Sequence, residues 1–146
     1  MTILISKANS LIDVGRGAGG LAVGICNVCP KIKATVADLP QVVSFSNQFI
    51  LEAGLSDRIT TMGIDLINSE LEGSYDVAVL RALIQVMKPE HAKKILKGVF
   101  QALEPNGHIY ILGIILDNTR LSPTVSMAFS LVFLNMYEEG GAYTEK

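Results

Sequence analysis

Residues 11–20 read Leu-Ile-Asp-Val-Gly-Arg-Gly-Ala-Gly-Gly, and this stretch decides the fold. An apolar run meets closely spaced glycines and then a helix-like segment, which predicts a strand, a tight turn and a helix start. Gly15, Gly17 and Gly19 carry no Cβ, so a ligand could lie against main-chain N–H groups at the positive end of a helix dipole. Gly15, Gly17 and Gly20 also satisfy the dinucleotide pattern G-x-G-x-x-G, so the turn alone fits two cofactor classes, or a loop without a ligand.

Acidic residues around the loop favour one cofactor class. Asp13 stands two residues before the first glycine, Asp38 follows the short apolar run 34–37, and Asp65 follows a third candidate strand. A carboxylate at the second position can accept hydrogen bonds from both ribose hydroxyls, and an oxygen at the third could accept from an adenine amino group. Three acids suit a ligand with hydroxyls, an amino group and a sulfonium cation, and they would repel a pyrophosphate. S-adenosylmethionine therefore fits better than NAD.

Strand and helix patterns alternate along the chain. Strands are predicted at 10–14, 33–37, 58–62, 75–80 and 108–112, and helices at 19–29, 41–53 and 89–103. Gly54 stands where the second helix should stop. This alternation predicts an α/β fold with a Rossmann-like, doubly wound, mostly parallel sheet. The ligand should bind at the carboxyl ends of the strands, where the strand order reverses between strands one and four.

Four segments carry a resemblance to a known family. They are Asp-Val-Gly-Arg-Gly-Ala-Gly at 13–19, Ala-Asp-Leu-Pro-Gln-Val-Val at 37–43, Ala-Gly-Leu-Ser-Asp-Arg-Ile at 53–59 and Ala-Leu-Glu-Pro-Asn-Gly at 102–107. The first resembles the glycine motif of class I S-adenosylmethionine-dependent methyltransferases, and the others resemble the plant caffeate and acetylserotonin type of O-methyltransferase. The similarity runs from about residue 10 to residue 144. It implies the class I methyltransferase fold and methyl transfer, of the O-methyl type, to a small-molecule acceptor.

The resemblance also implies site residues. It puts Gly15 and Gly17 under the methionine part of the cofactor, Asp38 on the ribose, Asp65 with Leu66 around the adenine, and Arg81 at the basic cofactor-contacting position. Together with the loop and acid positions above, the expected cofactor-binding set is Asp13, Gly15, Gly17, Gly19, Asp38, Leu39, Asp65, Leu66 and Arg81. No metal ligand is implied.

The chain departs from the family pattern at the position of the general base. Where the family has a His-Asp-Trp triplet, residues 82–87 read Ala-Leu-Ile-Gln-Val-Met, so Gln85 takes the place of the histidine. Gly113 takes the place of the acidic residue that orients it. An amide cannot take a proton, although Gln85 could hold an acceptor by hydrogen bonding. A catalytically weakened module that binds S-adenosylmethionine is therefore an alternative, and a nicotinamide dehydrogenase or a purely structural partner protein stays open.

Composition limits the remaining function classes. The chain has 146 residues, 49% of them hydrophobic, which suits one domain with a real core. A net charge of −2 gives no basic surface for nucleic acid. No apolar run is long enough for a signal peptide or a membrane span, so we expect a cytoplasmic protein. Cys26 and Cys29 form a C-x-x-C pair on one helical face, and packing is the preferred interpretation because no matching histidines accompany them.

The last apolar segment, 124–137, is apolar nearly all round and predicts a buried helix. By resemblance it would cover the acceptor pocket through Met127, Phe129, Phe133 and Met136, although core packing explains the same residues. Residues 1–146 would then form one S-adenosylmethionine-binding methyltransferase domain, without the N-terminal dimerisation domain and the last two strands of the family. Strand five would be a sheet edge and apolar surface would be exposed, so we expect a homo-oligomer, such as a dimer, or a fragment of a longer protein.

Overall fold

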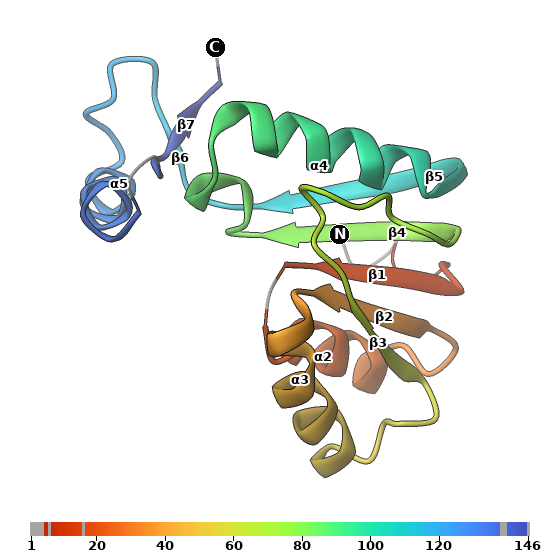
Figure 1. Cartoon of the computed structure of the whole chain (residues 1–146). Coiled ribbons are helices and arrows are strands. Elements are labelled where there is room, and N and C mark those ends of the chain that lie inside the picture. The colour runs from red at the N-terminus through yellow and green to blue at the C-terminus, as the bar shows by residue number, and fades with distance from the viewer. Residues whose placement is uncertain (1–4, 6, 16, 138–139, 146) are drawn as a thin grey trace.

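A five-stranded parallel sheet forms the centre of the molecule (Figure 1). The structure is a computed structural model that describes residues 5, 7–15, 17–137 and 140–145. The strand order is β3-β2-β1-β4-β5, so the chain moves outward from β1 to β3 and then returns to the other side of β1. The strands are β1 (Ser10–Val14), β2 (Lys33–Asp38), β3 (Ile59–Gly63), β4 (Tyr75–Arg81) and β5 (Leu103–Leu112). This is the doubly wound parallel sheet that the sequence predicts.

Helices cover both faces of this sheet (Figure 1). They are α2 (Gly20–Val28), α3 (Pro40–Glu52) and α4 (Pro89–Gln101). Leu11 of β1 belongs to the apolar cluster that includes residues of α2 and α3, whereas its neighbour Ile12 belongs to the cluster that includes residues of α4. Because successive side chains of a strand point to opposite faces, β1 has to be apolar on both sides, which explains its continuous apolar run.

The order of the strands fixes where a ligand can bind. β1 pairs in parallel with both β2 and β4, and the connections after β1 and β4 leave toward opposite sides of the sheet. The carboxyl ends of β1 to β4 lie at one edge of the sheet, and the turn after β1 opens there. A crevice at this reversal is the usual ligand position in such sheets.

The C-terminal part forms a small separate unit beside the sheet (Figure 1). The strands β6 (Ile115–Leu116) and β7 (Tyr143–Thr144) pair with each other, and α5 (Thr124–Met136) lies between them in sequence. A short 3-10 helix, η1 (Ile84–Val86), precedes α4. None of the described helices is both long and apolar enough to cross a membrane.

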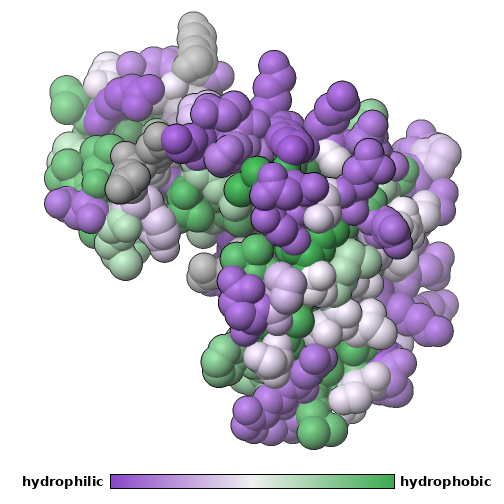
Figure 2. All heavy atoms as spheres, in the orientation of Figure 1, coloured by the Kyte–Doolittle hydropathy of each residue, from purple (hydrophilic) through white to green (hydrophobic). Residues whose placement is uncertain are grey.

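The prediction that α5 is buried is wrong. Ser126 is its one buried residue, and Phe129 and Met136 are 48% and 68% exposed. Figure 2 shows apolar side chains on the surface of this part of the molecule. A helix that is apolar nearly all round needs cover on several sides, and the described residues cover little of α5. The expectation of exposed apolar surface is therefore confirmed for this helix, and β5 is an edge strand as expected.

Candidate cofactor site

The glycine loop (residues 15–19) connects β1 to α2, and its described glycines adopt a backbone conformation that glycine permits. Gly15, Gly17 and Gly19 have φ angles of +69°, +62° and +74°, which lie in the left-handed region. Gly19 precedes the first turn of α2, so this helix begins without a side-chain cap. Residue 19 therefore caps none of the amide N–H groups of the first turn with a side chain. The strand, loop and helix start agree with the sequence prediction.

Gly15 also packs so closely against Leu83 that a side chain at position 15 would require Leu83 to move. A Cβ built on it would lie 2.5 Å from Leu83 Cδ1 and 2.7 Å from Leu83 Cδ2, well inside van der Waals contact. Leu83 is buried and follows β4. The contact therefore joins the glycine loop to the segment that carries Gln85. Arg16, which departs from the family pattern, lies outside the described residues.

Asp38 ends β2 and is hydrogen-bonded to the glycine loop. Its Oδ2 accepts from the N–H of Gly17 at 2.6 Å, and its Oδ1 accepts from the N–H of Leu39 at 2.7 Å. Each carboxylate oxygen has room for a second donor, so two further hydrogen bonds remain possible. Leu39 is 40% exposed beside it. The predicted residues Gly17, Asp38 and Leu39 are therefore brought together at the sheet edge.

Asp13 lies inside the molecule. It is 0% exposed, on the strand face that packs against α2, and its Oδ2 accepts from the N–H of Ala22 at 3.3 Å. A carboxylate at the start of a helix interacts favourably with the helix dipole. Asp13 thus fastens the first turn of α2 to β1. Direct contact between Asp13 and a cofactor stays a prediction.

Asp65 follows β3 and caps its own turn. Its Oδ1 accepts from the N–H of Ile67 at 3.0 Å, and its Oδ2 accepts from Nδ2 of Asn68 at 2.8 Å. The Asn68 amide, followed by the Ile67 N–H, holds the pKa of Asp65 below its ordinary value. Asp65 is therefore an ionised hydrogen-bond acceptor at neutral pH, as contact with an amino group requires.

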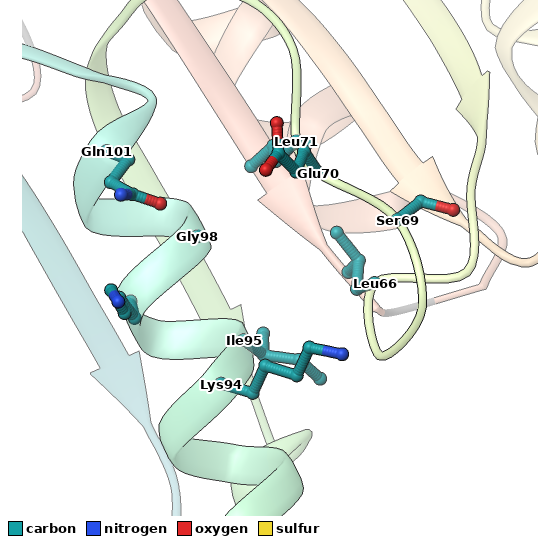
Figure 3. Close-up of a pocket in the computed structure, with 9 residues that line it drawn as sticks. Leu66, Ser69, Glu70, Leu71, Lys94, Ile95, Gly98 and Gln101 are labelled. Atoms are coloured by element: carbon teal, nitrogen blue, oxygen red, sulfur yellow. The ribbon is translucent and has the colours of Figure 1, made fainter.

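Leu66, the neighbour of Asp65, lines a cavity of about 410 Å³ (Figure 3). The cavity lies between the connection from β3 to β4 and the helix α4, and Figure 3 shows Ile95 and Lys94 of α4 on the side opposite Leu66. Gly17 and Asp38 do not line it. The structure thus places Leu66 in a cavity that the described glycines of the loop and Asp38 do not line, and its contact with an adenine stays a prediction.

Arg81 ends β4 and is exposed. It lines a groove of about 290 Å³ together with Gly20, Leu21 and Gly24 of α2. A guanidinium at this position lies beside the first turn of the helix that follows the glycine loop. The topology therefore brings the predicted basic residue to the same end of the sheet as the loop.

Sequence reasoning missed one residue of this site, Ser46. It is 0% exposed on α3, and its Oγ donates a hydrogen bond to the C=O of Gly17 at 2.5 Å. No sequence signal marks it, because a serine within a helix is usually a surface residue. Cys26, by contrast, is buried as the packing interpretation predicts, and burial raises the pKa of its thiol.

Comparison with known proteins shows the family. A family model described as an O-methyltransferase domain matches residues 2–146. The chain belongs to this family. A 3-hydroxy-5-methyl-1-naphthoate 3-O-methyltransferase of Streptomyces sahachiroi is 28% identical over 130 residues, which are 89% of this chain and 38% of the relative. Human N-acetylserotonin methyltransferase, in a crystal structure with S-adenosylmethionine, is 26% identical with a TM-score of 0.84 and covers 96% of this chain.

Not every similar protein has a name that includes methyl transfer. The aclacinomycin 10-hydroxylase RdmB of Streptomyces purpurascens is 31% identical over 107 residues, which are 73% of this chain and 28% of that protein. This O-methyltransferase domain spans about 38% of the Streptomyces sahachiroi relative and 39% of the human enzyme. The resemblance and the fold class predicted from the sequence are confirmed.

Gln85 and Gly113 lie side by side in this O-methyltransferase domain, and their assignment to the positions of a base and its orienting acid stays a prediction. A Cβ on Gly113 would lie 2.9 Å from Oε1 of Gln85. Gln85 is buried, and its Nε2 donates to the C=O of Ile114 at 2.5 Å. Its backbone C=O accepts from the N–H of Gly141 at 2.8 Å. The amide thus fastens η1 to the turn after β5, and it supplies no proton acceptor.

The four residues of α5 that the resemblance places over the acceptor pocket do not share one environment. Met127 and Phe133 are partly buried, whereas Phe129 and Met136 are exposed. The rings of Phe129 and Phe133 lie 6.4 Å apart, centre to centre. The helix therefore presents an aromatic stripe, and its role over an acceptor stays a prediction.

Proposed function

We propose that this chain forms the cofactor-binding part of an S-adenosylmethionine-dependent methyltransferase that acts on a small molecule, with oxygen as the favoured acceptor atom. The observation that carries the proposal is the pairing of the glycine loop with Asp38 at the strand reversal. The family membership supports it, as do relatives that are named O-methyltransferases.

The residues present suit this cofactor. Gly17 leaves open space, since a Cβ there would meet no atom of the described residues closer than 3.9 Å, so a ligand can approach the backbone of Gly17. The first N–H groups of α2 suit a carboxylate. Asp38 keeps acceptor capacity for two hydroxyl groups. Buried Asp13 accepts a hydrogen bond from the N–H of Ala22 and so fixes the first turn of α2 against β1.

When bound, S-adenosylmethionine would supply a methyl group on a positively charged sulfur. The chain's own contribution is to hold and align. The loop, Asp38 and Asp65 would fix the position of the cofactor, and alignment of two reactants can provide up to roughly 7–11 kcal/mol of a barrier. Gln85 itself supplies no base, so the acceptor would have to lose its proton to solvent or to another group, or react as an already ionised or neutral nucleophile.

We further propose an oligomeric state, a cellular location and a class of partner for this chain. A homo-oligomer such as a dimer is supported by the exposed apolar side chains of α5 and by the free edge of β5. A cytoplasmic location is supported by the free thiols of Cys26 and Cys29. The net charge of −2 argues against nucleic acid as a partner.

A second candidate is a module that binds the cofactor but transfers methyl groups weakly or not at all. The amide of Gln85 favours it, because its Nε2 is bound to Ile114 and it cannot act as a base. A relative named as a hydroxylase also indicates that names in this family are not confined to methyl transfer.

Calorimetric titration tests the proposal. The chain should bind S-adenosylmethionine and its demethylated product S-adenosylhomocysteine, and should ignore NAD. Asp38→Ala should weaken both affinities by roughly 10- to 150-fold, the range for hydrogen bonds to a charged group. Asp57→Ala is the matched control, because it removes the same charge from an exposed position before β3. Binding of NAD with no binding of S-adenosylmethionine would refute the proposal.

A further inference from the structure

Ser46 is a buried hydroxyl in the middle of a helix. It lies on α3 with 0% exposure, and the buried residues of this helix are Ser46 and Ile50. Helical serines commonly bond to a carbonyl of their own helix. Ser44, two residues earlier in α3, makes such a bond: its Oγ donates to the C=O of Gln41 at 3.3 Å. Ser46 instead makes its shorter hydrogen bond outside the helix.

The partner of Ser46 is the central glycine of the loop. Oγ of Ser46 lies 2.5 Å from the C=O of Gly17 and 3.5 Å from the C=O of Val42, so the bond to Gly17 dominates. On the other side, the N–H of Gly17 donates to Oδ2 of Asp38 at 2.6 Å. Both polar groups of Gly17 are therefore held by side chains from β2 and α3.

This double attachment opposes the freedom of glycine. Gly17 has a φ of +62° and no side chain that packs, so its neighbouring peptide groups could otherwise rotate with little steric cost. Rotation would turn the carbonyl oxygen away from α3 and would release the N–H from Asp38. A carbonyl turned toward the ligand would place negative partial charge where an anionic group should bind.

We propose that Ser46 is a positioning residue for cofactor binding, which acts through Gly17 and holds the glycine loop and Asp38 in their binding geometry. The identity of the ligand in this inference rests on the proposed function, whereas the effect of Ser46 on the loop does not depend on any ligand. Ser46 contacts the glycine loop through Gly17 and contacts no proposed reacting atom, so its influence must pass through the loop.

The test compares three variants of the chain. Ser46→Ala removes the hydroxyl, Ser46→Cys keeps a side chain of similar shape with a weak donor, and Ser44→Ala removes an exposed hydroxyl from the same helix. Amide exchange at Gly17, measured by NMR without ligand, should accelerate clearly in Ser46→Ala and remain normal in Ser44→Ala. Affinity for S-adenosylhomocysteine should fall about five- to tenfold in Ser46→Ala, as loss of one hydrogen bond predicts.

The outcomes separate this inference from the proposed function. If Ser46 only fills space, Ser46→Cys restores wild-type exchange and affinity, and the inference fails. If Ser46→Ala lowers the melting temperature without changing Gly17 exchange or affinity, the residue is merely structural, and the inference fails as well. If the wild type binds neither S-adenosylmethionine nor S-adenosylhomocysteine, the proposed function fails, and Gly17 exchange still decides whether Ser46 positions the loop.

Discussion

Replacing Gly15 by alanine should cost far more stability than the added methyl group suggests. Two effects add. The φ of +69° places an alanine in the left-handed region, which costs about 1–2 kcal/mol. The new Cβ would also lie 2.5 Å from Leu83 Cδ1, where carbon atoms prefer about 3.5–4.0 Å, and overpacking of this kind typically costs about 1–3 kcal/mol. We expect Gly15→Ala to lower the free energy of unfolding by about 2–5 kcal/mol.

Gly54 provides a matched control for the backbone effect. Its φ is +68°, almost the same as that of Gly15, but a Cβ on it would meet no atom within 4 Å. Gly54→Ala should therefore cost only the backbone strain of about 1–2 kcal/mol. The difference between the two variants isolates the contact with Leu83.

Urea unfolding of a double-mutant cycle measures that contact. Leu83→Ala alone should destabilise the chain by about 2–5 kcal/mol through the cavity it leaves. In the Leu83→Ala background, Gly15→Ala should cost no more than Gly54→Ala does. The reasoning is refuted if Gly15→Ala costs the same in both backgrounds, or if it matches Gly54→Ala in the wild-type background.

Other predictions concern the remaining acids and the missing base. An inosine analogue of S-adenosylhomocysteine should bind clearly worse than the adenosine form in calorimetry, since Asp65 would lose its donor; equal affinity removes Asp65 from the site. Asp76→Ala should cost about 1.5 kcal/mol in urea unfolding, because Asp76 accepts two N–H groups at the start of β1. Those bonds lower the pKa of Asp76, so its contribution to the free energy of unfolding is complete above the unfolded-state pKa of about 3.9 and is lost as pH falls through the lower folded-state pKa. If the variant loses stability at acid pH in the same way as the wild type, this reasoning is wrong. Gly113→Ala should destabilise the chain through contact with Gln85, whereas Gly141→Ala meets no atom within 4 Å and should not. Methyl transfer to phenols should rise with pH as each phenol ionises, and a shared inflection near pH 6.5 would show an unidentified histidine base.

The sequence predicted the sheet well where each strand is buried on both faces. The prediction for β1 matches the structure at both ends, and that for β2 ends one residue early. The prediction for β5 began at residue 108, whereas the strand begins at Leu103. Pro105, Asn106 and Gly107 are turn-forming residues, and Asn106 has a φ of +68°, so the local sequence argues against a strand here. Leu103 nevertheless pairs with Tyr75, and the register shifts before regular pairing with β4 begins at His108.

The candidate site was predictable where backbone demands select a residue type. Glycines with positive φ and a carboxylate at the end of β2 follow from the geometry of a strand, a turn and a helix. Ser46 was not predictable, because its role depends on how α3 packs against the loop. The burial of α5 was predicted wrongly for a related reason: an apolar pattern shows that a helix needs cover, and it does not show which chain segment provides it.

The missing base limits which acceptors the proposed methyltransferase can use efficiently. A positioned base is typically worth 10²- to 10⁴-fold, and alignment contributes independently of it. A phenol or alcohol is nucleophilic mainly as an anion, so it would suffer most of this deficit at neutral pH. A thiolate, a carboxylate, a neutral amine or an ionised enol would suffer little.

Because a Cβ at Gly113 would lie 2.9 Å from Oε1 of Gln85, an acid at position 113 requires a change at position 85 as well. Gln85→His alone would supply an imidazole that no acid orients, and it should recover only part of the lost rate. Restoring the family's chemistry therefore requires both substitutions together, and the single variants should be less active than the pair.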